Sequence, residues 1–321
     1  MNTLMMRPYL GKSDIKAIAD LVNTCDPVGQ LDKDKSVADL EMEIEQPFFE
    51  PKKDVRLWED NSGNLMGFGH ISRPQAKEAI DGYLYFYVHP RAHQESLEAE
   101  IIRWSERRMR QLQKEKHLPV NLRSSSRDDL RDRCSLLEEH NFKVDRSFFT
   151  MSRRLDEEIS TPQLPEGFSL RPLAGETEIK AWVDCFNQSF IDHWNHHELT
   201  LTTAKFWFND AQYRPDLNLV IVAPNGTIAG FSYASIYPEQ NNRLGTKEGW
   251  INWLGTSRNF RKMGLGKAVL LGSMQAFKTA GMDTVKLAVD ADSLTGATRL
   301  YESVGFKPVQ TWLSYVKPVI S

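Results

Sequence analysis

The sequence has few cysteines and lacks a long apolar run. Its three cysteines, Cys25, Cys134 and Cys185, are widely spaced and form no C-x-x-C pair. This spacing excludes a disulfide framework and favours buried thiols in a reducing compartment. The apolar residues near the start of the chain form too short a run for a signal peptide or a membrane helix, and charged residues interrupt them early. We therefore expect a cytoplasmic protein with no membrane partner.

A large net charge of either sign is also missing. The chain has 40 Lys and Arg residues against 43 Asp and Glu residues, and its formal net charge is −3. Proteins that bind nucleic acid electrostatically usually carry a clear excess of basic residues, so we expect no nucleic-acid partner. The 321 residues, 40% of them hydrophobic, are enough for two soluble domains of ordinary size. We expect a monomer or a homodimer.

The two best-known glycine signatures of nucleotide-binding loops are absent, but a shorter glycine loop is present. The run RKMGLG, residues 261–266, fits neither G-x-x-x-x-G-K-[ST] nor G-x-G-x-x-G, because Val269 stands where a third glycine would be. A strand-like run precedes it and a helix-like run follows it. A helix N-terminus attracts anions, and glycine lets the backbone approach them closely. The run therefore predicts a diphosphate-binding loop of another class.

The chain repeats itself at an offset of about 164 residues. The run MRPYLGKSDIKAIADLVN from Met6 aligns without a gap with LRPLAGETEIKAWVDCFN from Leu170. The run LLEEHNFK from Leu136 aligns at the same offset with LYESVGFK from Leu300, and NLMGF echoes TIAGF at an offset of 163. Three matches at nearly constant offset indicate two copies of one domain.

The boundary between the copies and the elements of the second copy follow from local patterns. A charged, proline-bearing segment, residues 153–167, is predicted to be a linker, and the two domains are predicted over residues 1–157 and 165–321. The runs of the second copy predict, in order, a strand at 168–173, a helix at 176–190, a hairpin at 217–237, a strand at 249–256, a helix at 264–281, a strand at 285–290, a helix at 295–305 and a closing strand pair at 306–317. This order indicates an α+β fold.

The motifs of the second copy resemble those of a known superfamily. The strand, the R-x-x-G-x-G loop and the helix are followed by A-x-x-L-Y-E-x-x-G-F at residues 297–306, and this series resembles the GNAT N-acetyltransferases. The tandem arrangement is similar to the mycothiol synthase family. The resemblance covers essentially the whole chain, although only the second copy has complete motifs. It implies two tandem GNAT-like domains, each with a mixed, mostly antiparallel sheet flanked by helices.

The resemblance also implies acetyl-CoA as co-substrate. In the family the pantetheine arm lies beside a strand, here at Leu254, Gly255 and Thr256. The diphosphate meets the loop amides, here those of Arg261, Lys262, Met263, Gly264, Leu265, Gly266 and Lys267. Ser293 stands near CoA, where the family usually has asparagine.

Two residues are implied to take part in catalysis. Tyr301 matches the tyrosine that gives a proton to the departing CoA thiolate, and the alternative is that it is a core residue. Trp250 stands where the resembling proteins have a strand carboxylate that serves as base. Glu248 lies on the same face two residues earlier, so it is our candidate base, acting through a water. The alternative is a solvated carboxylate in a hairpin turn.

The acceptor side is predicted from the segment FIDHWNHHE that begins at Phe190. By family position this segment borders the acceptor site, so Asp192, His193, Trp194 and the strand residue Asn252 are substrate-binding candidates. An exposed polar loop is the alternative. The histidines of the segment have a spacing that could bind a metal on a helix, but no fourth ligand is evident, so no metal is predicted.

The first copy lacks the glycines and the tyrosine that the second copy has in its motifs. In alignment, Ser96 falls on Gly264, Glu98 on Gly266 and Leu137 on Tyr301. A carboxylate at the diphosphate position opposes binding through charge and bulk. We interpret the first copy as a scaffold that forms one wall of the acceptor pocket.

The leading hypothesis is an N-acetyltransferase that moves an acetyl group from acetyl-CoA to a primary amine of a small molecule. Transfer would be direct, within a ternary complex, because an amine can attack a thioester without a covalent enzyme intermediate. One alternative is a non-catalytic acyl-CoA-binding or regulatory protein. Another is acylation of a protein N-terminus or lysine.

Overall fold

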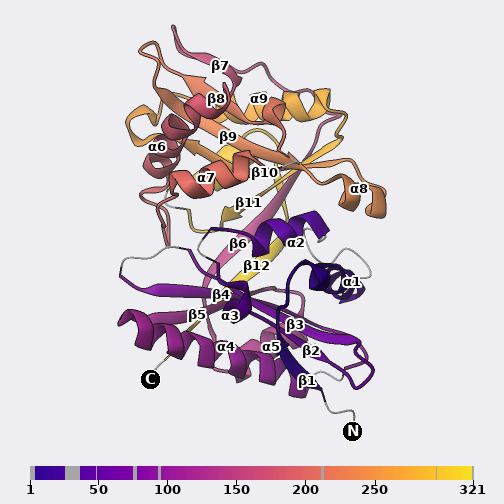
Figure 1. Ribbon diagram of the computed structural model, residues 1–321. Coiled ribbons are helices and arrows are strands. Elements are labelled where there is room, and N and C mark those ends of the chain that lie inside the picture. Colours follow the sequence, from indigo (N-terminus) through magenta and orange to yellow (C-terminus); the bar gives the residue numbers. More distant parts are fainter. Residues whose placement is uncertain are drawn as a thin grey trace. The chain divides into compact units, whose positions relative to one another are not determined.

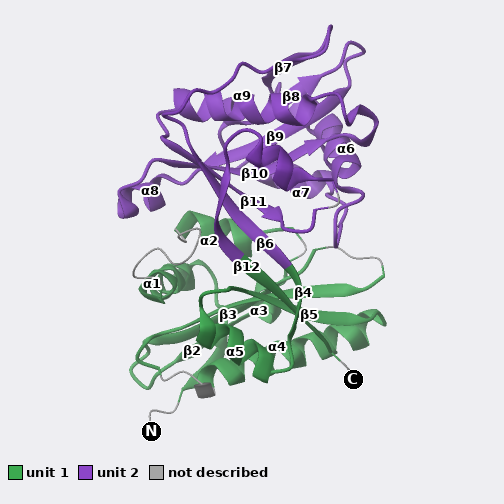
Figure 2. Ribbon diagram, turned by 180° about the vertical axis from the view of Figure 1, so that it is seen from behind, with its two compact units in different colours: residues 1–146, 312–321 green, residues 147–311 purple. Residues whose placement is uncertain are grey.

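The computed structural model describes residues 4–25, 37–47, 49–74, 78–92, 95–210, 213–293 and 295–319. The chain forms two compact units, coloured separately in Figure 2. Unit 1 contains residues 1–146 and 312–321, and unit 2 contains residues 147–311. Within the described ranges, no helix is both long enough and apolar enough to cross a membrane.

Unit 1 contains both helices and strands (Figure 1). They are β1 (Met5–Pro8), the 3-10 helix η1 (Lys12–Asp14), α1 (Ile15–Cys25), α2 (Val37–Ile44), α3 (Pro51–Asp54), β2 (Val55–Glu59), β3 (Leu65–Ser72), β4 (Ile80–Val88), α4 (Glu95–Lys116), β5 (Val120–Arg127), α5 (Arg131–Glu139), the first part of β6 (Lys143–Arg154) and the last part of β12 (Lys307–Pro318).

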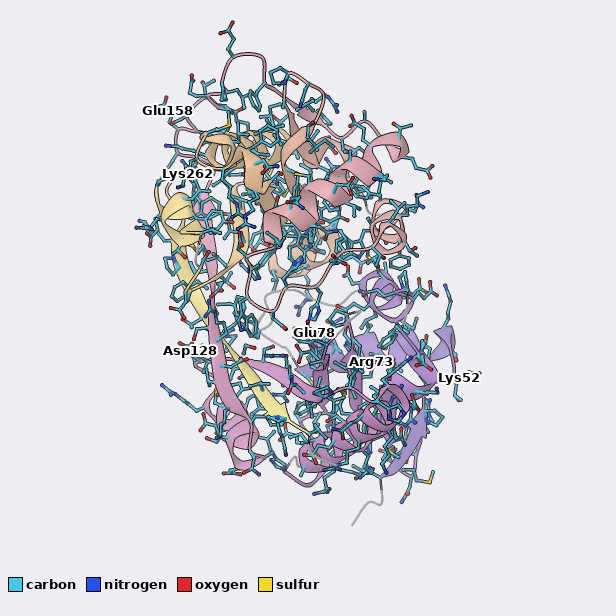
Figure 3. The ribbon with its side chains drawn as sticks, turned by 90° about the vertical axis from the view of Figure 1, so that its left-hand side faces the viewer. Lys52, Arg73, Glu78, Asp128, Glu158 and Lys262 are labelled. Carbon is cyan, nitrogen blue, oxygen red and sulfur yellow. The ribbon has the colours of Figure 1, made fainter. Side chains whose placement is uncertain are left out.

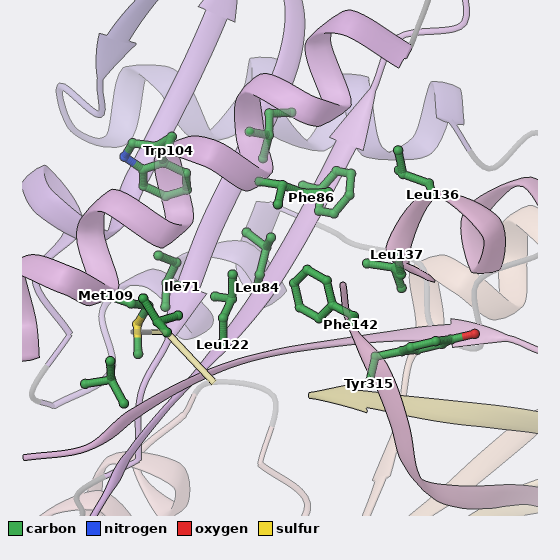
Figure 4. Packing of buried hydrophobic residues seen from close by; sticks show 14 of the residues in the cluster. Ile71, Leu84, Phe86, Trp104, Met109, Leu122, Leu136, Leu137, Phe142 and Tyr315 are labelled. Carbon is green, nitrogen blue, oxygen red and sulfur yellow. The ribbon is translucent and has the colours of Figure 1, made fainter. Parts of the chain in front are cut away.

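The sheet of unit 1 has the strand order β1-β2-β3-β4-β5-β12, and only the β4–β5 pair is parallel. The helix α1 buries Ile15, Ile18 and Val22, whose spacing places them on one helical face. They pack with β2 and β3 in one cluster, while α4 and α5 pack with β3, β4 and β5 in another. Figure 4 shows part of this second cluster. Helices therefore cover both faces of the sheet.

Unit 2 repeats this plan (Figure 1). Its elements are the rest of β6, β7 (Ser169–Pro172), η2 (Glu176–Glu178), α6 (Ile179–Phe190), α7 (Leu201–Phe208), η3 (Pro215–Leu217), β8 (Leu219–Val222), β9 (Ile228–Ile236), α8 (Pro238–Leu244), β10 (Glu248–Thr256), η4 (Arg258–Phe260), α9 (Leu265–Thr279), β11 (Thr284–Asp290), α10 (Ala297–Glu302) and the first part of β12.

The sheet of unit 2 has the order β6-β11-β10-β9-β8-β7, and only the β10–β11 pair is parallel. The helices α6 and α7 pack on one face with β8 and β9, and α9 packs on the other. The predicted hairpin is confirmed as β8 and β9, which turn at Asn225-Gly226 with a glycine φ of 83°. The α+β class and the mixed, mostly antiparallel sheets are confirmed. The predicted closing strand pair is instead one strand, β12.

The two long strands each contribute to both units. The strands β6 and β12 are corresponding strands of the two sequence copies, since each follows an N-F-K or G-F-K run. Residues 148–154 of β6 pair with β11 in unit 2, and residues 312–318 of β12 pair with β5 in unit 1. The spatial units thus differ from the predicted sequence domains at these strands. The repeat in the sequence does not show this exchange, because the apolar pattern of either strand would fit the sheet of either unit.

Candidate active site

A β-bulge in β10 changes which side chains share a face. The register of β10 against β9 shifts between Ile251 and Trp253. Ile251 packs in the cluster beneath α9, whereas Asn252 hydrogen-bonds Ser235 of β9 and Trp253 packs against α6. Consecutive strand residues ordinarily alternate between faces. The bulge therefore places two neighbouring side chains, Asn252 and Trp253, on the face that α6 covers.

The strands β10 and β11 pair at one end and separate at the other. Their parallel pairing ends where Ile251 lies opposite Leu287. Beyond that point β10 continues to Thr256 paired with β9 alone, and β11 continues to Asp290 paired with β6 alone. Among the strands that the structure describes, none pairs with this second edge of β10. The result is an opening between two diverging strands of one sheet.

The peptide groups that face this opening follow from the hydrogen bonds on the other edge. The N–H of Ser257 donates to the carbonyl of Ala229 at 2.9 Å, so Ser257 points its backbone groups towards β9. In an antiparallel pair the direction alternates with every residue. The N–H and C=O groups of Leu254 and Thr256 therefore face the opening. This edge can accept an extended ligand as an added strand.

The loop after β10 leads directly into α9. Lys262 and Gly264 have φ angles of 65° and 79°, which turn the chain at the helix start. Lys262 is labelled in Figure 3. The first bond of the helix runs from the N–H of Ala268 to the carbonyl of Gly264 at 3.0 Å. Three earlier N–H groups therefore have no acceptor within the helix; they belong to Leu265, Gly266 and Lys267. The predicted diphosphate loop thus has the geometry of an anion-binding helix start.

Gly266 lies where three elements meet. An ideal Cβ atom on Gly266 would lie 3.4 Å from Thr256 Oγ1 and 3.4 Å from Leu300 Cδ2. The end of β10, the start of α9 and the helix α10 are therefore immediate neighbours. The structure brings the predicted loop, the open strand edge and the Tyr301 helix together in one region.

Tyr301 is buried beside the closed end of the opening. It is 7% exposed and packs in the same cluster as Ile251, Leu287 and Val289. Burial raises the pKa of its phenol to about 12, so the hydroxyl stays protonated near neutral pH. Within the described residues, no group hydrogen-bonds this hydroxyl. A protonated phenol without a partner is suited to donating a proton to a ligand.

Two of the predicted residues bind each other. Arg261 Nη1 donates to Asp192 Oδ2 at 2.6 Å, and Nη2 donates to the carbonyl of Ser189 at 2.9 Å. The hydrogen bond from Arg261 lowers the pKa of Asp192 although burial opposes it. Gly255 lets α6 approach closely, because a Cβ atom there would lie 2.7 Å from Ser189 Cβ. Asp192 thus fastens the end of α6 to the loop.

Glu248 lies away from the loop and from the open edge. Its carboxylate forms an ion pair with Lys286 Nζ at 2.8 Å, and its strand position is at the paired end of β10. Leu254 is six positions beyond Glu248 along the strand, which corresponds to roughly 20 Å. The structure does not bring Glu248 together with the open edge or with the loop.

The remaining candidates lie in turns. His193 Nδ1 is 2.8 Å from the carbonyl oxygen of Trp194, and its ring packs edge-on against Phe190 at 5.7 Å. The Trp194 ring packs against Phe148 of β6 at 5.9 Å. These two side chains thus border the α6 face. Ser293 lies at the end of β11, and its Oγ is 3.0 Å from Thr295 Oγ1.

No group of three or more His, Cys, Asp and Glu side chains is placed to hold a metal ion within the described ranges. The histidines of the segment that follows α6 are not on a helix, because α6 ends at Phe190. Their spacing of three and four residues therefore does not place them on one helical face.

Most of the side chains that line the α6 face were not predicted from the sequence. Aromatic rings gather there from α6, α7, β9 and β10, in contacts of 4.7 to 6.5 Å; they are Phe186, Phe190, Trp207, Tyr233 and Trp253. A polar chain adjoins them, in which Tyr237 Oη donates to Asn252 Oδ1 at 3.3 Å and Asn252 Nδ2 donates to Ser235 Oγ at 2.9 Å. The alternation of side chains along β9 could have indicated that Tyr233 and Ser235 share this face.

Unit 1 has the corresponding strands, but side chains occupy the place of the opening. Its parallel pair β4–β5 ends at Tyr83 and Arg123. The next residue, Ser124, donates its hydroxyl to the carbonyl of Leu84 at 3.0 Å, which links the strands where they would separate. The Arg133 guanidinium lies 3.4 Å above the ring of Phe86.

The Glu98 carboxylate lies near the Arg133 guanidinium. Burial lowers the pKa of Arg133 to about 10, and the nearby Glu98 carboxylate acts in the opposite direction. Arg133 thus remains cationic near neutral pH, with Glu98 near it at the position that corresponds to Gly266. The placement of the Ser96 side chain lies outside the described residues.

Comparison with known proteins agrees with this geometry. Residues 179–306 match the sequence model of the Acetyltransferase (GNAT) family. The mycothiol acetyltransferase of Saccharopolyspora erythraea is 24% identical over 262 residues, which are 77% of this chain and 80% of that protein. The mycothiol acetyltransferase of Thermobispora bispora is 30% identical over 166 residues. That match covers 50% of this chain and about half, 54%, of the relative.

Solved structures share the fold along nearly the full length. A GCN5-related N-acetyltransferase from Sphaerobacter thermophilus has a TM-score of 0.74 at 22% identity, covering 99% of this chain and 96% of that one. A tandem GNAT protein from the clavulanic acid biosynthesis pathway has a TM-score of 0.73 at 14% identity, covering 99% of both chains. The family match over residues 179–306, the relatives and the two-unit fold agree: this chain has the fold of tandem GNAT proteins and is similar in sequence to the mycothiol acetyltransferases.

Proposed function

We propose that unit 2 transfers an acetyl group from acetyl-CoA to a primary amine of a small molecule, directly and within a ternary complex. The observation that carries this proposal is the junction of three features at one place. The open edge of β10, the start of α9 and the buried phenol of Tyr301 meet around Gly266 and Leu300. The fold could form without an open strand edge, a glycine at the helix start or a buried phenol.

The proposed position of the cofactor follows from the free backbone groups. The diphosphate would lie at the start of α9, where the N–H groups and the helix dipole favour negative charge. The pantetheine arm would then lie along Thr256 and Leu254 as an added strand. The side chains of Lys262 and Lys267 add positive charge around this start. Arg261 would act through the loop that it braces, since its guanidinium is bound to Asp192 and Ser189.

The proposed chemistry uses this chain's own groups at two steps. A neutral amine attacks the thioester carbonyl, and the N–H of Leu254 stabilises the oxygen as negative charge develops on it. The C–S bond then breaks, and the sulfur takes the proton of Tyr301 as it leaves. The proton lost by the amine returns to solvent, and Tyr301 is reprotonated from solvent. No step needs a covalent bond to the protein.

The acceptor is proposed to reach the thioester from the α6 face. Asn252, His193 and Trp194 would bind it there, whereas Asp192 would contribute by holding the loop. Glu248 would serve as base only through a chain of waters, because its carboxylate is bound to Lys286 and lies far along the strand. The absence of a nearer strand carboxylate, with Trp250 in its place, favours the second candidate function, a non-catalytic acyl-CoA-binding protein.

Replacing Tyr301 with phenylalanine separates these two candidates. We expect CoA affinity to be unchanged and kcat for acetyl transfer to fall by roughly 10²-fold, the range for losing a positioned acid. The ring would keep its packing against Phe306, 6.0 Å away, so a folding defect would not explain the loss. CoA binding by calorimetry and thiol release over a panel of amines would measure both quantities.

A matched control is Tyr315→Phe in unit 1, which removes another buried hydroxyl and should leave transfer unchanged. If Tyr301→Phe retains full kcat with weakly reactive amines as well as reactive ones, Tyr301 is a packing residue. If the wild-type protein binds CoA but acetylates no amine in the panel, the non-catalytic candidate is favoured.

One CoA is expected to bind per chain. In unit 1 the bond between Ser124 and Leu84 closes the place where the strands would separate, and Arg133 covers Phe86 there. A calorimetric titration should therefore give a stoichiometry of one, and Gly266→Glu in unit 2 should remove it entirely. Two equivalent sites, or one site that survives Gly266→Glu, would contradict this interpretation of unit 1.

A further inference from the structure

The closed end of the opening between β10 and β11 is filled with apolar side chains. Ile251 and Leu287, the last paired residues, are 3% and 1% exposed. Val289 follows on the same face of β11, just beyond the last pair, and is also buried. Together with Tyr301 these residues form one packed cluster. No acyl chain could extend past them without displacing a buried side chain.

The opposite face of the closed end is also occupied. The bulge directs Asn252 and Trp253 towards α6, and the Trp253 ring lies 5.2 Å from Phe186 and 5.5 Å from Phe190. Asn252 is held by Ser235 at 2.9 Å. Side chains on both faces of β10 thus border the point at which β10 and β11 join.

The direction of a bound acyl-CoA follows from the proposed function, on which this step rests. The diphosphate loop follows the C-terminal end of β10. A pantetheine arm added to the open edge therefore runs from Thr256 back towards Asn252, against the strand direction. Its acyl group arrives at the closed end, and each added methylene points at Ile251, Leu287 and Val289.

We propose that these three side chains restrict the acyl donor to two or three carbons, with Val289 setting the limit. Val289 is the first buried side chain beyond the last strand pair, so it is the one that a growing acyl chain meets. Adding methylenes to a packed site forces side chains from their rotamers. One surplus methylene in an apolar pocket lowers kcat/KM by about 10- to 200-fold.

The test compares acetyl-, propionyl-, butyryl- and hexanoyl-CoA with the wild-type protein and two alanine variants. For the wild type, kcat/KM with butyryl-CoA is expected to be at least about 10²-fold below that with acetyl-CoA. Val289→Ala should raise the butyryl-to-acetyl ratio about tenfold or more. Val285→Ala is the matched control, because it removes the same atoms from the same buried face of β11, at the paired end, and should leave the ratio unchanged.

Binding of the same acyl-CoA series without an amine, followed by calorimetry, keeps the inference testable if no acceptor is found. The order of affinities and the effect of Val289→Ala should match those above. Equal kcat/KM or equal affinity for acetyl- and hexanoyl-CoA would overturn the length limit, while acetyl transfer itself would stand. An identical change of ratio in Val285→Ala and Val289→Ala would also overturn it, because general loosening of the core would then be the cause. Binding with the expected order but no transfer would leave the length limit intact and refute the proposed enzyme function.

Discussion

Replacing Gly266 with glutamate is expected to abolish CoA binding while the protein stays folded. A Cβ atom at Gly266 fits, since it would lie 3.4 Å from its nearest neighbours, Thr256 and Leu300. The carboxylate would extend to the start of α9, where the diphosphate is proposed to lie. Two unit charges 4 Å apart repel by about 4 kcal/mol at an effective dielectric constant of 20. Affinity should therefore fall by about 10³-fold or more.

Two further variants at Gly266 separate charge from bulk. Gly266→Ala should bind CoA within a few fold of the wild type, because only the Cβ atom is added. Gly266→Gln has the bulk of glutamate without its charge and should fall between the two. Calorimetry would give the affinities, and thermal unfolding would confirm that the fold is retained. If Gly266→Glu binds CoA normally, the diphosphate does not lie at this helix start.

Ending the chain after Thr311 is expected to unfold unit 1. Residues 312–318 of β12 pair with residues 121–127 of β5, and their loss would leave that strand with an unpaired edge. Tyr315 of this segment is fully buried beside Phe142 and Leu137 (Figure 4). Loss of one such aromatic side chain alone costs about 3–5 kcal/mol, against a typical domain stability of about 5–15 kcal/mol. Hydrogen exchange should show that β4 and β5 have lost protection.

Point variants and a peptide sharpen this test. Tyr315→Ala in the full chain should lower the free energy of unfolding by about 3–5 kcal/mol. Val309→Ala, on an exposed part of the same strand, should change it by at most about 0.5 kcal/mol. A synthetic peptide of residues 312–321 should restore protection to the shortened chain. A shortened chain whose unit 1 unfolds with unchanged free energy would show that β12 is dispensable there.

Much of the fold was predictable because its signals are local or repeated. The hairpin at Asn225-Gly226 depends on positive φ at the turn, which few residues tolerate. The helix start at Gly264 followed from glycine spacing, and the duplication followed from matches at a constant offset. Each of these features needs only neighbouring residues, so the sequence contains them directly.

The exchange of β6 and β12 was not predictable in this way. The two strands correspond in the repeat, and either sheet could accept either strand by its apolar pattern. Only the register of β12 against β5 and of β6 against β11 decides between the possibilities. The same holds for the predicted strand pair at the C-terminus, which is one continuous strand because its two halves lie in different units.

In the candidate site, too, some features were predictable from the sequence and others were not. The sequence by itself predicted the candidate groups, which are the glycines of the loop and the phenol of Tyr301, and it showed that both are replaced in the first copy. The tertiary structure alone decided which of them meet. It paired Asp192 with Arg261 and Glu248 with Lys286, and it opened β10 beyond Ile251. The reason is physical, because ion pairs, bulges and strand separation depend on contacts between residues distant in sequence, and these contacts leave no periodic signal along the chain.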